Sequence, residues 1–332
     1  MKAEKNYIMR DSKIKKDISI FPVYKGDNDY LLNLSLILKN SFSSVEFVGF
    51  PLKQMLKMVL NKKKSDVLIL NWLEDYPSLK KGLLAEGLET LRFTFGMFIA
   101  NLYYRKIIWV RHNFRPHLEH SKLCYRIICW VISFFSDNIV THRSVQEFDS
   151  AVIFHPLYKK TNTKIAAPLD YLIFGNIKPY KNIPLILESW EPKRELRIIG
   201  KCKSAELNDQ ITAVIKDRQP NVIYENRFME IEELNGLLSS VNFVILAHEE
   251  ASMIVSGTFY HAISYGANVI LKDTQYAKTI KNEFPLIHIV KDFSGDALSS
   301  LAPFPREEII ALANRTYSNR VIANQWSSLL AD

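Results

Sequence analysis

Ser256, Gly257 and Thr258 form a triplet whose residue types suit the binding of an anion. Ser256 is a preferred helix N-cap, and the apolar residues after it share one helical face up to Gly266, which suits the position just beyond a helix. A helix N-terminus without bulky side chains exposes backbone N–H groups and the positive end of the helix dipole. The triplet therefore predicts a phosphate-binding helix, followed by a buried strand over residues 269–271.

The segment FGNIKPYKN, residues 174–182, is a second element that suits a phosphate. It leaves an apolar run, turns at Gly175, and places Asn176 and Lys181 beyond the carboxyl end of the expected strand. A lysine there supplies a point charge to a phosphate, and an asparagine can donate a hydrogen bond. The alternative is a glycine turn followed by an ordinary surface lysine. Because residues 256–258 belong to the same half of the chain, the two elements together indicate a diphosphate.

The segment IIWVRHNFRPHLEH, residues 107–120, runs from an apolar strand into a polar loop. The loop contains Arg111, His112, Asn113, Arg115, His117, Glu119 and His120. An isolated histidine is more often structural, but α/β enzymes keep polar chemistry at the carboxyl ends of their strands, which favours a functional loop. The spacing between His112 and His117 does not require a shared helical face, so we do not expect a zinc pair.

The segment KGDND, residues 25–29, contains an Asp-x-Asp pattern that in other enzymes holds a divalent metal together with a diphosphate. Here it follows the first predicted strand, where a glycine-containing loop before a helix explains it equally well. We therefore predict no metal site. Asp27 or Asp29 can instead act as a base or hold a hydroxyl group.

Strand and helix patterns alternate along the chain, which predicts an α/β fold with parallel, doubly wound sheets. In the first half, strands are expected at 18–24, 45–48, 67–70, 107–110 and 138–141, and helices at 30–40, 83–102 and 118–135. In the second half, strands are expected at 171–174, 196–199, 222–224 and 243–246, and helices at 183–190, 205–216 and 231–239.

A domain boundary is expected within HPLYKKTNTKIAAPLD, residues 155–170, where prolines, polar residues and a lysine pair interrupt the pattern. The predicted domains are residues 1–158 and 159–315, followed by a C-terminal helix within 316–332 that can cross back to the first domain. Two such domains would face each other across a cleft, with ligands at the carboxyl ends of the strands.

The composition fits a globular protein of two domains, with 332 residues of which 48% are hydrophobic. The cysteines, Cys124, Cys129 and Cys202, are odd in number and match no metal-binding spacing, which favours a reducing compartment and buried thiols. The N-terminus lacks the apolar core of a secretion signal. The most apolar runs of the whole chain, residues 93–104 and 127–135, are shorter than the ~18 residues that span a bilayer, so no integral membrane protein is expected.

The net charge of +8 is confined to the first half of the chain. Residues 1–150 hold 23 Lys and Arg against 15 Asp and Glu, whereas residues 151–332 hold 20 of each kind. This asymmetry indicates an anionic partner for the first half, and nucleic acid and an anionic membrane surface both fit; a solvated basic face is the alternative. No nucleic-acid-binding motif accompanies the charge, so we expect no nucleic acid partner.

Six segments resemble, in the same order, motifs of the GT-B fold glycosyltransferases that build bacterial capsule, exopolysaccharide or O-antigen. In the second half, FGNIKPYKN resembles "GxIxPYKG", and HEEASMIVSGTFYHAISYGANVI resembles "SGTxxxAxSxGxPVI". In the first half, FPVYKGDNDY resembles the "NPY" loop, VLILNWLEDYP resembles "VHLHWPE", and IIWVRHNFRPHLEH resembles "WTxHNxxPHE". VIFHPLY, between the halves, resembles "HPxY". Because the similarity covers most of the chain, it carries more weight than any single motif.

The resemblance implies a GT-B fold with two Rossmann-like domains and a UDP- or GDP-linked hexose donor held mainly by the second domain. The diphosphate would lie near Lys181 and residues 256–258, and the base near Arg227 and Phe228. The full implied donor set is Gly175, Asn176, Lys181, Arg227, Phe228, Glu250, Ser256, Gly257 and Thr258. The implied acceptor set is Arg111, Asn113, Arg115 and His117, with His112 nearest the reaction centre and Asp27 or Glu119 as a base.

The resemblance also implies an acceptor, namely an oligosaccharide or a sugar on a polyprenyl diphosphate at the inner face of the cytoplasmic membrane. The protein would then be cytoplasmic and peripheral to that membrane, which would account for the basic first half and for FTFGMFIANLYY and YRIICWVISFF. The alternative for these segments is that they are core helices. No cofactor or divalent metal would be needed beyond the nucleotide sugar.

The sequence departs from the retaining branch of this family. That branch has an arginine where this chain has Asn176, and two glutamates where it has Met253 and His261. Asn268 replaces the motif proline. These changes fit the branch without the glutamate pair, with Glu249 and Glu250 available to bind the donor sugar. They also leave a second hypothesis, a catalytically degenerate GT-B module that binds a nucleotide sugar or glycan and assists a partner transferase.

Overall fold

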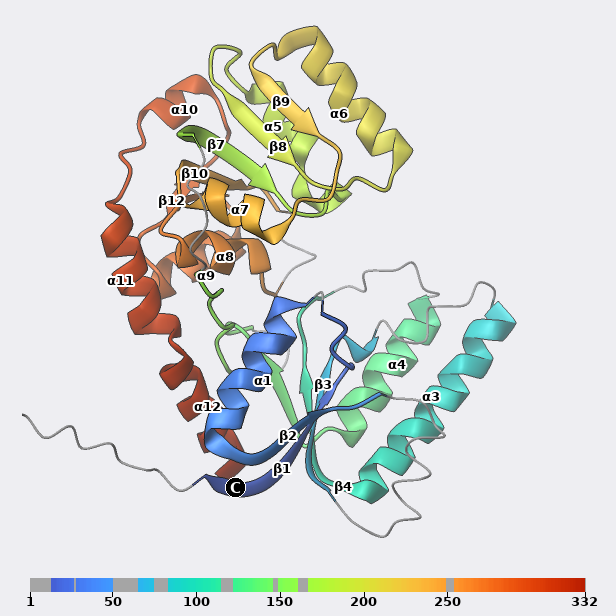
Figure 1. Ribbon diagram of the computed structural model, residues 1–332. Coiled ribbons are helices and arrows are strands. Elements are labelled where there is room, and N and C mark those ends of the chain that lie inside the picture. The colour runs from blue at the N-terminus through green and yellow to red at the C-terminus, as the bar shows by residue number, and fades with distance from the viewer. Residues whose placement is uncertain are drawn as a thin grey trace, which may run out of the picture. The chain divides into compact units, whose positions relative to one another are not determined.

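The computed structural model describes residues 13–26, 28–49, 65–74, 83–114, 122–145, 149–160, 167–248 and 254–331 (Figure 1). Contacts divide the chain into two compact units. The first unit contains the chain up to Val110, Leu118–Ile139 and the end of the chain from Ala323. The second unit contains Arg111–His117 and Val140–Ile322. Residues 140–158, which precede the boundary predicted from the sequence, thus group with the second unit.

The first sheet is parallel, with the strand order β2-β1-β3-β4-β5-β6. Its strands are β1 (Ile14–Phe21), β2 (Phe42–Phe47), β3 (Ser65–Asn71), β4 (Tyr104–Val110), β5 (Asn138–Thr141) and β6 (Ala151–Val152). Helices α1 (Asp29–Ser41), α3 (Leu83–Tyr103) and α4 (Lys122–Phe135) connect them. Residues 67–70 of β3 and 107–110 of β4 form continuous apolar, buried runs, as expected for parallel strands covered on both faces.

The second sheet is also parallel, with the strand order β12-β11-β10-β7-β8-β9. Its strands are β7 (Leu169–Phe174), β8 (Leu196–Ile199), β9 (Val222–Glu225), β10 (Val241–Leu246), β11 (Asn268–Lys272) and β12 (His288–Val290). The connecting helices are the 3-10 turn η2 (Pro179–Lys181), α5 (Ile183–Ser189), α6 (Ala205–Arg218), α7 (Ile231–Leu238), α8 (Gly257–Ser264), α9 (Gln275–Glu283) and α10 (Gly295–Ser299). Helices α11 (Arg306–Tyr317) and α12 (Asn319–Ala331) end the described chain.

The predicted strands and helices are confirmed, with shifts at their ends. Strand β1 stops at Phe21 instead of residue 24, because Pro22 has no N–H with which to extend the ladder. Residues 118–121 of the helix predicted over 118–135 lie outside the described residues. Strands β6 and β12 and helices α9, α10 and α11 were not predicted. Of the three free cysteines only Cys202 is buried, because the other two lie on partly exposed positions of α4.

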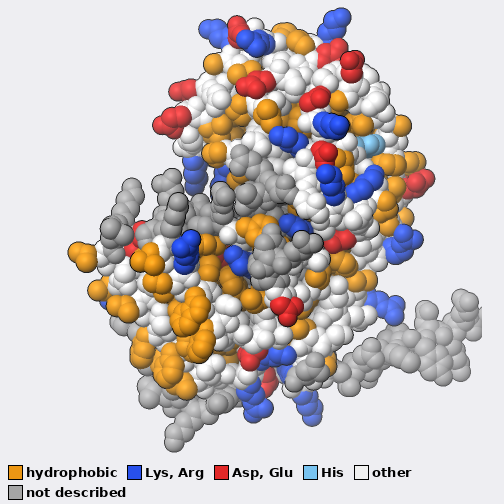
Figure 2. Space-filling view, turned by 180° about the vertical axis from the view of Figure 1, so that it is seen from behind, with side chains coloured by type: hydrophobic (Ala, Val, Ile, Leu, Met, Phe, Trp, Pro, Cys, Tyr) orange, Lys and Arg blue, Asp and Glu red, His pale blue; other side chains and the backbone are white. Residues whose placement is uncertain are grey.

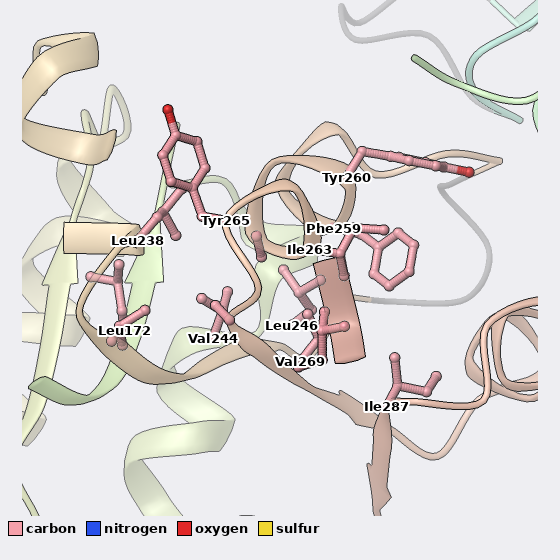
Figure 3. Packing of buried hydrophobic residues seen from close by; sticks show 14 of the residues in the cluster. Leu172, Leu238, Val244, Leu246, Phe259, Tyr260, Ile263, Tyr265, Val269 and Ile287 are labelled. Carbon is pink, nitrogen blue, oxygen red and sulfur yellow. The ribbon is translucent and has the colours of Figure 1, made fainter. Parts of the chain in front are cut away.

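Buried apolar side chains cover both faces of the second sheet and hold α8 in place. One cluster packs α8 against strands β10 and β11, and the other packs β7, β8 and β10 against α5 and α6. Figure 3 shows Phe259 and Ile263 of α8 close to Leu246 and Val269. Gly266 has φ +75, so the predicted left-handed residue after α8 is confirmed. The N-terminus of α8 is therefore fixed relative to the sheet.

Candidate functional site

The candidate site lies where the order of strands reverses in the second sheet. The chain enters at β7, adds β8 and β9 on one side, and then adds β10, β11 and β12 on the other. Strands β7 and β10 are parallel neighbours, with Leu172 opposite Val244, so their carboxyl ends are adjacent. Open α/β sheets bind ligands at such a reversal, in the crevice beyond the carboxyl ends. The segments that follow β7 and β10 therefore border this crevice.

Lys181 follows β7 and folds back towards the end of that strand. Its Nζ donates a hydrogen bond of 2.6 Å to the backbone oxygen of Phe174, and only 6% of the residue is exposed. Burial, helped by the charge of Lys178, lowers the pKa of Lys181 to about 7. Within the described part of the chain, no carboxylate pairs with this ammonium group. Lys181 is therefore a buried cationic site that an anion can compensate.

Gly175 brings Lys181 and α8 to the same space. Its φ of +83 is in the left-handed region, which favours glycine. A Cβ atom built on Gly175 would lie 3.4 Å from Lys181 Nζ and 3.9 Å from Thr258 Oγ1. The ammonium group and the hydroxyl group thus both border the space above this glycine. A ligand oxygen there can contact both.

Ser256 caps α8 as predicted. Its Oγ accepts a hydrogen bond of 3.4 Å from the backbone N–H of Phe259. The N–H groups of Gly257 and Thr258 precede the first helical hydrogen bond and point out of the helix end. Together with Lys181, they make this edge of the sheet electropositive.

His248 follows β10 and was not predicted as a site residue. Its imidazole is almost fully buried, and burial, followed by the positive charge of Lys181, lowers its pKa to about 3. Its Nδ1 has no hydrogen-bond partner among the described atoms. Its ring lies 5.4 Å from that of Tyr180, and Asn182 Nδ2 donates to the adjacent Ala247 oxygen at 2.9 Å. A neutral imidazole with an unused nitrogen beside Lys181 points to a polar ligand.

His112 follows β4 and belongs to a series of buried rings in the second unit. Its ring centroid lies 5.0 Å from that of His142, which lies 5.4 Å from that of His155. His155 stacks on Tyr260 of α8 at 4.6 Å. Burial lowers the pKa of His142 to about 4, so this ring is neutral at neutral pH. The ring contacts connect His112 to α8, although sequence spacing gave no sign of His142 or His155 beside it.

Arg227 and Phe228 follow β9, at the far side of the sheet from β12. The Arg227 guanidinium pairs with Glu225 at 2.8 Å and with Glu233 at 2.5 Å, and these carboxylates raise its pKa. Phe228 is 72% exposed, so its ring can stack on a planar ligand. Arg227 is thus an ion-paired residue, whereas Phe228 presents an open apolar face.

The remaining predicted residues are dispersed or lie outside the described chain. Asn176 is exposed, Arg111 is half-buried with its Nε donating to Asn113 O at 3.3 Å, and Asp29 is the first residue of α1. The predicted residues outside the described residues are Asp27, Arg115, His117, Glu119 and Glu250. Within the ranges that the structure covers, no three His, Cys, Asp or Glu side chains form a group that could hold a metal ion.

Comparison with solved structures shows which fold this arrangement belongs to. Anabaena Alr3699/HepE in complex with UDP and glucose matches with a TM-score of 0.66 at 12% identity, over 95% of this chain and 99% of that one. Sucrose-phosphate synthase (tll1590) from Thermosynechococcus elongatus matches with a TM-score of 0.64 at 11% identity, over 96% and 98%. AviGT4, a glycosyltransferase involved in Avilamycin A biosynthesis, matches with 0.58 at 15% identity, over 95% and 98%.

Neither a protein-family model nor a curated protein sequence matches this chain. The structural matches span nearly the whole chain, and both six-stranded parallel sheets belong to the shared architecture. The chain therefore has the two-domain α/β architecture of the GT-B fold, as the sequence predicts.

Proposed function

We propose that the protein is a glycosyltransferase that moves a hexose from a UDP- or GDP-linked donor to a lipid-linked or oligosaccharide acceptor. The observation that carries the proposal is the buried Lys181 ammonium beside the Thr258 hydroxyl and the N-terminus of α8, at the strand reversal of the second sheet. This group of donors suits a diphosphate. HepE, which shares the fold, binds UDP, UDP-glucose, and UDP together with glucose, and this supports the choice of ligand.

In the proposed reaction an acceptor hydroxyl attacks the anomeric carbon while the bond to the diphosphate breaks. Negative charge then builds up on the departing diphosphate, where Lys181 and the α8 N–H groups stabilise it. We assign His112 to the reaction centre, and Asp27 or Glu119 to removal of the hydroxyl proton. Phe228 stacks on the base of the donor. The diphosphate is neutralised by these protein groups without a divalent metal.

The test is a thermal-shift titration with UDP, GDP, ADP, CMP and dTDP, with and without magnesium. A ligand that binds only the folded protein raises its stability by ~2.7 kcal/mol at ~100 times its dissociation constant. We expect one diphosphate to stabilise the protein without magnesium, and Lys181→Ala to abolish the effect. No stabilisation by any of the nucleotides would contradict the proposal.

A transfer assay separates the enzyme from a degenerate binding module. The retaining branch has a glutamate where α8 carries His261, and this imidazole is buried with Nε2 donating to Asn235 Oδ1 at 2.9 Å. The position therefore supplies no carboxylate. Stabilisation by a nucleotide without donor hydrolysis or transfer to any of a broad acceptor panel would favour the second hypothesis, a GT-B module that assists a partner.

We further propose that the acceptor is lipid-linked and that the outer face of α3 and α4 contacts an anionic membrane surface. The two helices contact each other and expose large apolar side chains at intervals of three or four residues. This α3/α4 apolar face consists of Leu84, Leu88, Leu91, Phe95, Phe98, Leu102, Leu123, Ile127, Trp130 and Phe134. Figure 2 shows hydrophobic side chains gathered on this part of the molecule. No described helix is both long and apolar enough to cross a bilayer.

The cations of α4 support an anionic membrane as the partner of the α3/α4 apolar face. Helix α4 has no acidic residue, and its Arg126 is exposed next to the apolar side chains. Helix α3 carries Glu86, Glu89 and Arg92, with Arg92 paired to Glu89, and the positive excess of the protein lies in residues 1–150. Apolar side chains beside cations suit the interface of an anionic membrane. The protein would then be cytoplasmic and peripheral to the inner face of the plasma membrane.

Vesicle co-sedimentation tests this surface. We expect binding to vesicles of phosphatidylcholine mixed with phosphatidylglycerol, but not to phosphatidylcholine alone, and loss of binding in Trp130→Ser with Phe134→Ser. Ile223→Ser, which changes an exposed apolar residue of β9, is the matched control and should bind normally. Equal sedimentation of all three proteins, or a dimer that the double variant dissociates, would contradict the assignment.

A further inference from the structure

The hydroxyl of Tyr158 lies at the N-terminus of α8. A Cβ atom built on Gly257, the first residue of α8, would lie 3.0 Å from Tyr158 Oη. The hydroxyl is therefore next to the outward-facing N–H groups of the first helical turn. Tyr158 was not predicted as a site residue, although it ends the HPLY segment.

Three contacts hold this tyrosine on α8. Its ring is parallel to that of His261, with a 4.2 Å centroid distance and a 2° interplanar angle. Its backbone N–H donates to Ser264 Oγ at 2.9 Å. His261 is itself held by the buried Asn235 at 2.9 Å. Because the ring and the backbone of Tyr158 are both anchored on α8, the hydroxyl keeps its place at the helix end.

The surroundings of this hydroxyl are those of the candidate diphosphate site. Thr258, adjacent to Gly257, shares the space above Gly175 with the buried Lys181 ammonium. The buried His248, with Nδ1 unpartnered among the described atoms, lies close enough for the Lys181 charge to act on it. A tyrosine hydroxyl supplies one further donor, and phosphoryl oxygens accept strong hydrogen bonds.

We infer that Tyr158 is a ligand-binding residue that donates a hydrogen bond from Oη to a phosphoryl oxygen of a diphosphate at α8. The inference rests on the proposed function and adds a residue from the segment that precedes β7. It also gives Gly257 a specific role, because any side chain there would meet the hydroxyl. The glycine of the Ser256–Thr258 triplet thus makes room for the tyrosine.

Tyr158→Phe is the test, because it removes the hydroxyl and keeps the ring stacked on His261. Calorimetric titration with UDP and with inorganic pyrophosphate should show about tenfold weaker binding of both, equivalent to about 1.4 kcal/mol, with an unchanged melting temperature. Tyr265→Phe is the matched control, since this tyrosine caps the other end of α8 and its hydroxyl donates to Lys159 O at 3.4 Å. That variant should bind as the native protein does.

Gly257→Ala gives a second, independent measurement. The added methyl group should displace the hydroxyl and weaken pyrophosphate binding, but it should have little further effect in the Tyr158→Phe background. Native affinity in Tyr158→Phe combined with lost affinity in Lys181→Ala would overturn the inference and leave the proposed function intact. The inference would also be overturned if Tyr158→Phe lowered both the affinity and the melting temperature while Gly257→Ala bound pyrophosphate with native affinity. If native protein binds neither UDP nor pyrophosphate, the proposed function itself fails.

Discussion

Lys181 and Arg227 are both cations at the carboxyl edge of the second sheet, yet their environments are opposite. Lys181 is buried, its Nζ donates to a backbone carbonyl, and burial lowers its pKa to about 7. Arg227 is partly exposed, and Glu225 and Glu233 neutralise it and raise its pKa. The sequence predicts a donor-binding role for both, but only one of them lacks a counter-ion among the described residues.

This difference shows what a buried cation without a counter-ion is suited to do. A charge removed from water without a partner costs free energy in the unliganded protein, and a bound anion restores the lost interaction. A cation that already pairs with two carboxylates must break those pairs before it can serve a ligand. The affinity for the diphosphate is therefore expected to depend strongly on Lys181 and weakly on Arg227.

The largest expected effect is that of Lys181→Met. The variant keeps an apolar chain of similar length and removes the charge, so pyrophosphate binding should weaken by about 100-fold, the upper range for a hydrogen bond to a charged group. Isothermal calorimetry measures the change. Lys178→Met, which removes a neighbouring lysine of the same loop, is the control and should lose far less affinity. Equal losses in the two variants would mean that only the overall charge of the loop matters.

Phe228→Ala should separate the base from the diphosphate. The exposed ring follows β9, and stacking of a base on an aromatic ring is worth ~1–3 kcal/mol, so UDP should bind about tenfold more weakly. Pyrophosphate, which has no base, should bind unchanged. Ile231→Ala changes a neighbouring exposed apolar residue and serves as the control for both ligands. Weaker binding of pyrophosphate to Phe228→Ala would place the ring near the phosphates instead.

Local chemistry explains which parts of this site could be predicted. The Ser256 cap, the left-handed Gly266 and the turn at Gly175 depend on the conformational preferences of single residues, which short sequence patterns carry. The parallel sheets follow from the alternation of apolar strands with amphipathic helices. These features therefore agree between sequence and structure.

Contacts between side chains that lie far apart in the sequence could not be predicted from it. The sequence does not show that the Lys181 side chain folds back to donate to the Phe174 carbonyl. Nor does it show that Arg227 forms an ion pair with Glu233. His248 and Tyr158 belong to segments that the family motifs include, but their positions at the site depend on β10 and α8 packing together. The sequence therefore predicts the backbone elements of the site but not all of the side chains that line it.

The affinity for UDP should fall with pH because of Lys181. Its pKa of about 7 means that the binding-competent ammonium form decreases from pH 7 to pH 8, where affinity should drop about fivefold. The β-phosphate of UDP is already mostly ionised at pH 7, and His248 is neutral, so the loss of the Lys181 ammonium should dominate the trend. Lys181→Arg keeps its charge and should lose the pH dependence.

The same group should affect stability in the opposite direction. The folded pKa of Lys181 is below its ordinary value of 10.5, so between pH 7 and pH 10.5 the folded state binds fewer protons than the unfolded state. The Lys181 contribution to the free energy of unfolding without ligand should therefore rise with pH in this window. Below pH 7 the buried ammonium group destabilises the folded state to its full extent. Denaturation of native protein and Lys181→Met at pH 7 and pH 9 measures the difference. A constant difference would contradict the shifted pKa.

The smallest expected effect is that of Arg227→Met on pyrophosphate binding. Solvent screens the Arg227 guanidinium, which is already engaged by Glu225 and Glu233, so the affinity should change by less than about threefold. Glu233→Gln removes one of these partners and should strengthen pyrophosphate binding slightly, because the guanidinium then regains donors for an anion. If Arg227→Met instead weakens binding as much as Lys181→Met does, the ligand must displace the two carboxylates. The contrast between the buried and the paired cation would then hold only for the unliganded protein.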